Sequence, residues 1–517
     1  MKNTATNRVK VESGGQGVVA HVGLHALGSV ADALGLGAAL SSRLDYTNGR
    51  APLHDRGKVI VQMALVLAGG GESCADVEHL RVQKDLFGDV ASDSTVYRTF
   101  HEFDAVQRGE FARALAEVRE KVWAKLDAPS EPVILDFDAT LVMGLAESKE
   151  HAASTYKGGF GFHPLFCFSD LTGETLSHTL RPGNATAHNA ADHVEVLDKA
   201  LAQLPAALRA GHGVADEFTP SRQVIARADN AGCTFEFLAA CRARKVNFSV
   251  TARANARLQS ALYVVASRED LWQPSFTQGG TLREGASVCE ITDFFTLRKM
   301  PSGTRCIVRR EPLDPGAQRS LFPSDEFRYW GFYTDCEGDP VELDLVMRAH
   351  AHVEDHIQRL KESGLTRFPF TKFEVNANWL MTVAMAADLV RWFQLLCLEG
   401  RWRDARPKAL RWEIFHAPGR IVRSARRVVV RVLEGWPTAR QLLGAYQRIV
   451  LLTRRVPRSS QRYLRGDCSA STDSWSHFAW SKFECRTLKG TRQRVDRLQR
   501  RQSLKSGRDN GLQPLHE

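Results

Sequence analysis

The sequence predicts an α/β fold in which a mixed β-sheet carries a β-rich insertion and is flanked by helical regions. A strand-like run at 133–142 is followed, after short connections, by two more at 163–168 and 174–181. Helix-like and strand-like segments then alternate from 187 to 250. Short connections favour antiparallel pairing and intervening helices favour parallel pairing, so the sheet should contain both directions.

The composition is that of a globular protein with a basic surface. The chain has 517 residues, of which 43% are hydrophobic, so it should divide into several domains or carry a large insertion. Its net charge of +10 favours a polyanionic partner such as nucleic acid. The ten cysteines include no CxxC pair and are typical of reduced, buried thiols. The N-terminus is polar and lacks the apolar core of a signal peptide.

Residues 1–128 are expected to form a helical N-terminal region that binds DNA. Helical patterns are clear at 59–67 and 110–126. Between them, two helix starts flank a turn at 87–89, and Ser92 or Ser94 is a natural N-cap for the second. That helix would present Thr95, Tyr97 and Arg98 to DNA, although simple packing is the commoner reason for such a pair.

The run at 133–142 carries two carboxylates in an otherwise apolar strand. Asp136 and Asp138 lie two residues apart and therefore share one face. Because a buried carboxylate needs a cation or a donor network, we expect at least one of them to hold a catalytic metal ion. A helix cap or an Asx turn explains the pattern equally well at this point. Asp229 directly follows the strand-like run 223–228 and lies at a second strand end, where sites gather.

The order of elements in 129–251 is that of the first part of a ribonuclease H-like catalytic core. Residues 252–340 follow as the predicted β-rich insertion, with the strand-like runs 261–266, 286–297, 304–309 and 327–334. Trp272 and Trp330 could stack on an unpaired base there, although indoles in such modules are usually core residues.

Residues 341–400 should complete the catalytic core with two helices. On the first, at 345–361, His350, Glu354 and Lys361 fall on neighbouring positions of one side, which places a carboxylate between two phosphate-binding cations. The second, at 379–398, is the longest apolar segment, with Asn376 or Asn378 as its predicted cap. Charged residues inside it favour a buried helix over a membrane span, so no membrane contact is expected.

Residues 401–455 are predicted to form a basic helical C-terminal region. Spacings of three and four residues would cluster its arginines on a helix that contacts phosphates; they are Arg420, Arg423, Arg426, Arg427 and Arg431. Residues 456–517 are rich in Ser, Arg, Gln and Gly, and we predict a disordered tail.

Five short words, in their order and spacing, resemble a known group of proteins. They are LDFDATLV at 135–142, RPGNA at 181–185, RADNAG at 227–232, RAHAHVED at 348–355 and NANW at 376–379. They resemble the DDE insertion-sequence transposases, most closely the family numbered thirteen-eighty, which is related to the piggyBac elements. The resemblance spans about 20–455 and implies a ribonuclease H-like core and cut-and-paste DNA transposition. Such a protein binds terminal inverted repeats, cleaves the strands with a metal ion and transfers them to target DNA.

The resemblance also implies roles for single residues. The acidic triad falls on Asp138, Asp229 and Glu354, with Asp136 as the fallback first acid. In this scheme Asp138 bridges two Mg²⁺ ions, for which Mn²⁺ can substitute, and each of the other acids holds one. Lys361 matches the lysine of the signature around the third acid. His350 stands where that signature has Arg, which leaves it as a phosphate contact.

The same resemblance leads to expectations about assembly and place. Transposition joins two transposon ends, so a homodimer on double-stranded DNA is expected, in the cytoplasm at the nucleoid. Two alternatives stay open. A domesticated or decayed transposase would bind DNA without catalysis. A zinc site formed by His350, His352, Glu354 and His356 would use the i, i+4 spacing of its last two histidines.

Overall fold

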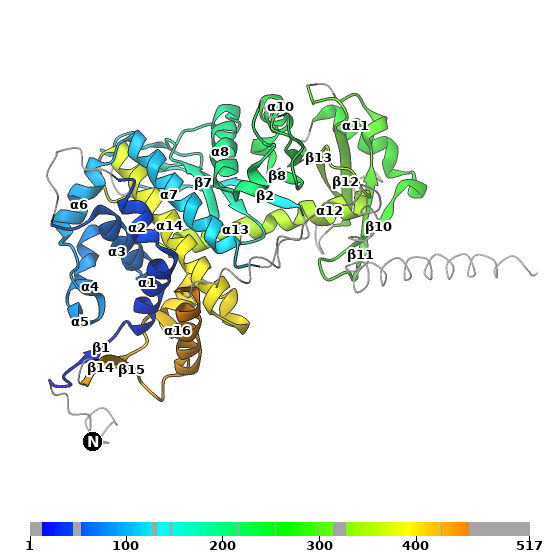
Figure 1. The fold of residues 1–517 in the computed structure, drawn as a ribbon. Coiled ribbons are helices and arrows are strands. Elements are labelled where there is room, and N and C mark those ends of the chain that lie inside the picture. Colours follow the sequence, from blue (N-terminus) through cyan, green and yellow to red (C-terminus); the bar gives the residue numbers. More distant parts are fainter. Residues whose placement is uncertain are drawn as a thin grey trace, which may run out of the picture.

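The computed structural model describes residues 13–44, 53–126, 132–144, 147–214, 217–253, 255–297, 299–313, 327–424 and 427–453. The predicted tail 456–517 and Arg426 lie outside these ranges. Figure 1 shows helices α1 to α6 at one end of the molecule and strands β10 to β13 at the other, with strands β2, β7 and β8 between them.

The N-terminal part is helical, as expected, apart from one short strand. Its elements are β1 (Val18–Val19), α1 (Val22–Leu34), α2 (Leu36–Ser41), α3 (Arg56–Gly69), a 3-10 turn (Cys74–Val77), α4 (Glu78–Arg81), α5 (Lys84–Phe87), α6 (Asp93–Glu102) and α7 (Ala105–Trp123). Ser92 caps α6 by accepting a hydrogen bond from the Thr95 backbone N–H, which confirms the predicted start of that helix. Tyr97 is half exposed and stacks on His101, with ring centroids 4.0 Å apart.

The centre of the molecule is a nine-stranded mixed sheet with the order β10-β11-β12-β13-β9-β8-β2-β6-β7. Its middle strands are β2 (Val133–Ala139), β6 (Leu165–Ser169), β7 (Thr175–Thr179), β8 (Val224–Ala228) and β9 (Asn247–Thr251). Strand β2 runs parallel to β8 and antiparallel to β6, and β8 runs parallel to β9. The two pairing directions predicted from the connection lengths are therefore present. A separate small sheet contains β3 (Val142–Met143), β4 (Ala153–Ser154) and β5 (Phe160–Phe162).

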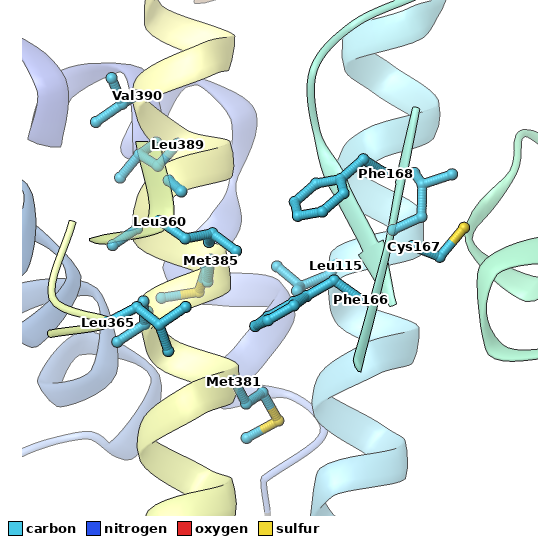
Figure 2. Packing of buried hydrophobic residues seen from close by; sticks show 14 of the residues in the cluster. Leu115, Phe166, Cys167, Phe168, Leu360, Leu365, Met381, Met385, Leu389 and Val390 are labelled. Atoms are coloured by element: carbon cyan, nitrogen blue, oxygen red, sulfur yellow. The ribbon is translucent and has the colours of Figure 1, made fainter. Parts of the chain in front are cut away.

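Helices cover both faces of this sheet. One face carries α8 (Ala190–Gln203) and α10 (Phe235–Ala243), with α9 (Ala206–Arg209) and a 3-10 turn (Asn230–Gly232) in the connections. The other carries α12 (Pro340–Arg348), a 3-10 turn (Ala349–Ala351), α13 (His352–Glu362) and α14 (Phe373–Cys397). Figure 2 shows Phe166 and Phe168 of β6 pointing toward α14, whereas Cys167 between them points away. This alternation, usual for a strand, assigns each side chain of β6 to one face.

The segment 252–340 extends the central sheet instead of forming a sheet of its own. It contains α11 (Ala256–Ala266), 3-10 turns (Glu269–Leu271 and Thr292–Phe294), β10 (Gln273–Phe276), β11 (Leu282–Glu290), β12 (Arg305–Pro312) and β13 (Phe327–Thr334). Strand β13 joins the sheet by pairing with β9. The predicted strand at 261–266 is wrong: Asn255 caps a helix there by accepting from two backbone N–H groups, and Leu258, Ala261 and Val265 bury one helical stripe.

The two tryptophans of this segment differ in their surroundings. Trp272 is buried and its indole N–H donates to the Val265 carbonyl at 3.0 Å, so it is a core residue and the base-stacking alternative does not apply to it. Trp330 is partly exposed, and the guanidinium of Arg309 covers its ring at 4.8 Å. The Arg309 side chain already occupies that face of the Trp330 indole.

Helix α14 is the central helix of the main core. It is long and apolar enough to cross a membrane, but 89% of its apolar window is buried inside the protein. Leu360 and Leu365 pack against it from one side and Leu115 of α7 from another (Figure 2). The predicted caps are wrong, because α14 begins at Phe373. Asn376 instead bonds both backbone polar groups of Phe370, and Asn378 donates to the carbonyls of Phe100 and Phe103.

The C-terminal part corrects the predicted basic helical region. After a 3-10 turn (Gly400–Arg403), α15 (Pro407–Leu410) and a π-helical turn (Arg411–Phe415), the chain forms a β-hairpin of β14 (Gly419–Ser424) and β15 (Arg427–Val432), then α16 (Ala439–Thr453). The hairpin pairs with β1. The physical reason is the run of β-branched residues at 421–422, 428–430 and 432, which packs better on a pleated strand than on a helix.

Candidate functional site

Two of the predicted acids lie on neighbouring strands, at the carboxyl-terminal ends of those strands. In the parallel pair of β2 and β8, the last partners are Phe137 and Ala228. Asp138 and Asp229 each follow by one residue, at the carboxyl ends of their strands. Asp229 also caps the 3-10 turn after β8, where its Oδ1 accepts from the Ala231 N–H at 2.8 Å. Its second carboxylate oxygen makes no hydrogen bond to the described residues. Parallel neighbouring strands thus bring two partly exposed carboxylates together.

The fallback acid, Asp136, occupies a different environment one step back along β2. Its register partner on β8 is Arg227, and both side chains are fully buried. Arg227 Nε and Nη2 each donate to one oxygen of Asp136 at 2.6 Å, which is a bidentate ion pair. His350 Nδ1 lies 2.8 Å from Asp136 Oδ1. Asp136 is therefore fully engaged, and the hydrogen bonds to its charged form hold its pKa below the usual value even though burial opposes this.

The third acid reaches the site from a segment far along the chain. The predicted single helix over 345–361 is in fact α12, a 3-10 turn and α13, and Glu354 lies in the first turn of α13. This helix contacts β2. The carboxylate of Glu354 is exposed and makes no ion pair within the described residues. It acts electrostatically on Asp138, as Asp229 also does, so the three acids surround one region.

The electrostatics of this region are those of a cation site, because the three carboxylates act on one another there. Burial, followed by the charges of Asp229 and Glu354, raises the pKa of Asp138 to about 6. The available donors are carboxylate oxygens, the ligands that Mg²⁺ and Mn²⁺ prefer. Among the described residues, however, no three His, Cys, Asp or Glu side chains are gathered closely enough to hold a metal ion in this conformation. The donor chemistry fits a divalent cation, and Glu354, which is exposed and unpaired in the described part of the chain, is the side chain able to adjust.

The structure does not bring together the three histidines that the zinc alternative requires. His352 is exposed and points to Asp170, with Nδ1 3.1 Å from Oδ1. His356 is packed against the ring of Phe168, and burial lowers its pKa to about 4. Since His350 is bonded to Asp136, these side chains have three different sets of neighbours and do not converge.

Comparisons with known proteins identify the family. The family model described as "Transposase DDE domain group 1" matches residues 1–454. The chain belongs to this transposase family. No curated protein sequence matches the chain. Among solved structures, a piggyBac transposase in a synaptic complex with hairpin DNA matches 87% of this chain and 86% of its own, at 10% identity and a TM-score of 0.37.

Of the other residues predicted to bind phosphate in this transposase, only some are free to do so. Lys361 is partly buried on α13, seven residues after Glu354, and its ammonium group pairs with no carboxylate of the described residues. Arg423 is paired with Asp85 at 2.6 Å. Arg427 is exposed at the start of β15. Arg426 lies outside the described ranges.

The structure adds one cation that the sequence-based prediction missed. Arg253 follows the end of β9, the third parallel strand, and thus lies at the same sheet edge as Asp138 and Asp229. Its Nε donates to the Asn230 carbonyl at 3.4 Å, and its Nη2 is buried without a hydrogen-bond partner in the described part of the transposase. The available signal was a basic residue just beyond a strand parallel to the two acidic ones.

The raised pKa of Asp138 predicts a measurable effect on the stability of the metal-free transposase. An acid whose folded pKa is raised binds more protons in the folded state, so stability falls as pH rises from about 3.8 to about 6. Asp138→Asn removes this loss. We expect it to raise the melting temperature at pH 8 and to have little effect at pH 4.

Thermal denaturation at both pH values, in the presence of EDTA, tests this expectation. The exposed Asp270, paired with Arg268 at the far edge of the sheet, supplies the control Asp270→Asn. An equal shift of the Asp138→Asn protein at pH 4 and pH 8 would contradict the electrostatic explanation.

Proposed function

We propose that this protein is an insertion-sequence DNA transposase that binds terminal inverted repeats and catalyses metal-dependent strand cleavage and strand transfer in cut-and-paste transposition. The observation that carries the proposal is the placement of Asp138 and Asp229 at adjacent ends of parallel strands, with Glu354 facing them. The strand order β7-β6-β2-β8-β9, with β2 antiparallel to β6, supports a ribonuclease H-like core.

In the proposed reaction, Asp138, Asp229 and Glu354 hold two divalent cations, Mg²⁺ or Mn²⁺. Such ions, when bound, activate a water or 3′-hydroxyl and stabilise charge on the attacking and leaving oxygens. Arg253 and Lys361, neither of which pairs with a carboxylate of the described residues, bind phosphate oxygens beside the scissile bond. Asp136 stays with Arg227 and takes no direct part in the chemistry.

A second basic surface supports binding to DNA away from the three acids. In the hairpin register Arg420 pairs with Arg431, and Ser424 pairs with Arg427, so the three arginines share one face of the hairpin. All three are exposed, and no carboxylate of the described residues pairs with them. The opposite face carries the buried Ile421. Like charges directly opposite on a sheet repel, and phosphates relieve this repulsion.

Double-stranded DNA, comprising the terminal repeats and the target, is therefore the proposed partner. Two transposon ends must meet during transposition, so the proposed working state is a homodimer on DNA, in the cytoplasm at the nucleoid.

Replacing Arg420, Arg427 and Arg431 together by Ala is expected to weaken DNA binding and to reduce its dependence on salt. For B-DNA the slope of log K against log salt is about −0.9 per phosphate contact, so three lost contacts should change it by about 2.7. Fluorescence anisotropy of labelled duplex DNA, measured at salt concentrations from about 50 to about 200 mM, gives both the DNA affinity and its salt slope.

Arg423 provides a matched control on the other face of the same hairpin. Because its guanidinium is committed to Asp85, Arg423→Ala should leave the salt slope unchanged. An unchanged slope in the triple variant as well would exclude this face of the hairpin from the DNA interface.

An excision assay tests the proposed function. A marked element with its flanking inverted repeats is incubated with the full chain in Mg²⁺, in Mn²⁺ and in EDTA. We expect precise removal of the element with either metal ion and none in EDTA. DNA binding without excision under every condition would instead favour the alternative of a domesticated or decayed transposase.

A further inference from the structure

Two pairs of side chains, one pair on β2 and one on the helical segment that contacts it, have nearly the same spacing. Asp136 and Asp138 are two residues apart on β2, a rise of about 6.6 Å, and they share one face of the strand. His350 and Glu354 are four residues apart on the helical segment that contacts β2, a rise of about 6 Å. His350 is bonded to Asp136 and Glu354 acts electrostatically on Asp138, so the two pairs meet in the same order.

The first members are bonded, since His350 Nδ1 lies 2.8 Å from Asp136 Oδ1. Asp136 is ionised and both of its oxygens already accept from Arg227, so it accepts the Nδ1 hydrogen as well. This arrangement assigns the hydrogen of the imidazole to Nδ1 and fixes the orientation of the ring.

Arg227 fixes the other side of the same arrangement. Besides Asp136, its guanidinium donates to the Val346 carbonyl of α12 and contacts Asp170 Oδ1 at 3.1 Å. One buried cation therefore ties β2 and β8 to the segment that carries Glu354. Arg227, Asp136 and His350 form a connected set of hydrogen bonds, and each precedes one of the three acids by two or four residues; we call this set the clamp.

We infer that the clamp positions Glu354 over Asp138 and Asp229, so that His350 is a positioning residue and not a phosphate contact. This inference rests on the proposed function, because it assigns a role within the same cation site. Its consequence is that the bond at Nδ1 of His350, and not the outer nitrogen Nε2, sets the affinity of the three acids for a divalent cation.

Two substitutions of His350 separate these roles. The amide nitrogen of Asn stands where Nδ1 of His stands, so His350→Asn keeps a donor for Asp136. The amide of Gln reaches the position of Nε2, so His350→Gln keeps a donor toward a phosphate and loses the bond to Asp136. Substitution of Asp136 itself would remove the bidentate partner of the buried Arg227, leave it only the contact with Asp170, and destabilise the fold.

The experiment measures Mn²⁺ binding to the DNA-free full chain by electron paramagnetic resonance, together with the Mg²⁺ midpoint of strand cleavage. We expect His350→Asn to remain within about threefold of wild type, and His350→Gln to weaken both quantities about tenfold, at the lower end of the usual cost of losing a residue that orients metal ligands. DNA affinity in EDTA and the melting temperature should be similar for the two variants.

The reverse order of the two variants, with Gln close to wild type and Asn impaired, would overturn the clamp and assign His350 to a phosphate. Equal values for both variants, whether impaired or not, would also overturn it. Absence of cleavage by the wild-type chain would count against the proposed function alone, since Mn²⁺ binding reports on the clamp without DNA.

Discussion

Asp138→Ala is expected to reduce strand cleavage at a transposon end at least about 10³-fold, because several kcal/mol of metal-dependent charge stabilisation are lost. DNA binding should change by less than about twofold, since the carboxylate contributes no attraction to phosphates. We expect this effect because the charges of both other acids act on Asp138, which ends the strand that pairs in parallel with β8 and antiparallel with β6. Cleavage of a labelled repeat-end duplex and anisotropy of the same duplex give the two quantities.

The control for this substitution is Asp270→Ala, on the far side of the sheet, where the carboxylate is exposed and paired with Arg268. It should cleave at the wild-type rate. A tenfold change in rate corresponds to only about 1.4 kcal/mol of activation free energy. If Asp138→Ala cleaves within about tenfold of the wild-type rate, Asp138 is not part of the cation site.

Arg119→Ala is expected to lower the free energy of unfolding by about 3–5 kcal/mol, the usual cost of breaking a buried ion pair. Arg119 bonds Glu174 Oε1 at 2.8 Å and Asp388 Oδ2 at 2.6 Å, and all three side chains are almost completely buried. The indoles of Trp123 and Trp392 donate to Glu174 as well. Without the guanidinium, two carboxylates would be buried with no cation. Urea denaturation followed by tryptophan fluorescence measures the loss.

This network also joins distant parts of the chain, because α7, the turn before β7 and α14 each contribute one charged group. Burial raises the pKa of Asp388 to about 7, so this carboxyl is the member that takes up a proton most readily. The partly exposed Arg43, which pairs with Glu110 at 3.1 Å, is the control: Arg43→Ala should cost far less than Arg119→Ala, because solvent screens this pair. Comparable losses for the two variants would contradict the importance given to burial.

Sequence patterns predicted most of what depends on neighbouring residues. The apolar run with two acids became β2, and the strand followed by Asp229 became β8, because period-two patterning and strand length are local properties. Patterning alone could not decide between Asp136 and Asp138, and only the resemblance favoured Asp138. That choice depends on sheet register, which places Arg227 opposite Asp136 and another acid beside Asp138, 91 residues further along the chain.

The incorrect predictions also arise because pairing and packing with other parts of the fold decided the structure. Arginine spacing at 420–431 suited a helix, but the β-branched residues between them pair as a hairpin against β1. The run at 261–266 suited a strand, but the Asn255 cap and the stripe of buried residues make it a helix. Arg253 was missed because its relation to the acids depends on three parallel strands ending at one edge of the sheet.

The central claim is that Glu354 acts together with the two strand-end acids, although it follows strands β10 to β13 in the sequence. The most direct test is the rate of strand cleavage by Glu354→Ala on a repeat-end duplex in Mg²⁺, with DNA affinity measured in parallel. Glu362→Ala, on the same helix but bonded to the Lys408 backbone N–H, is the matched control. The three-acid site predicts cleavage lowered at least about 10³-fold with unchanged DNA affinity. Cleavage at the wild-type rate by the Glu354→Ala protein would contradict it.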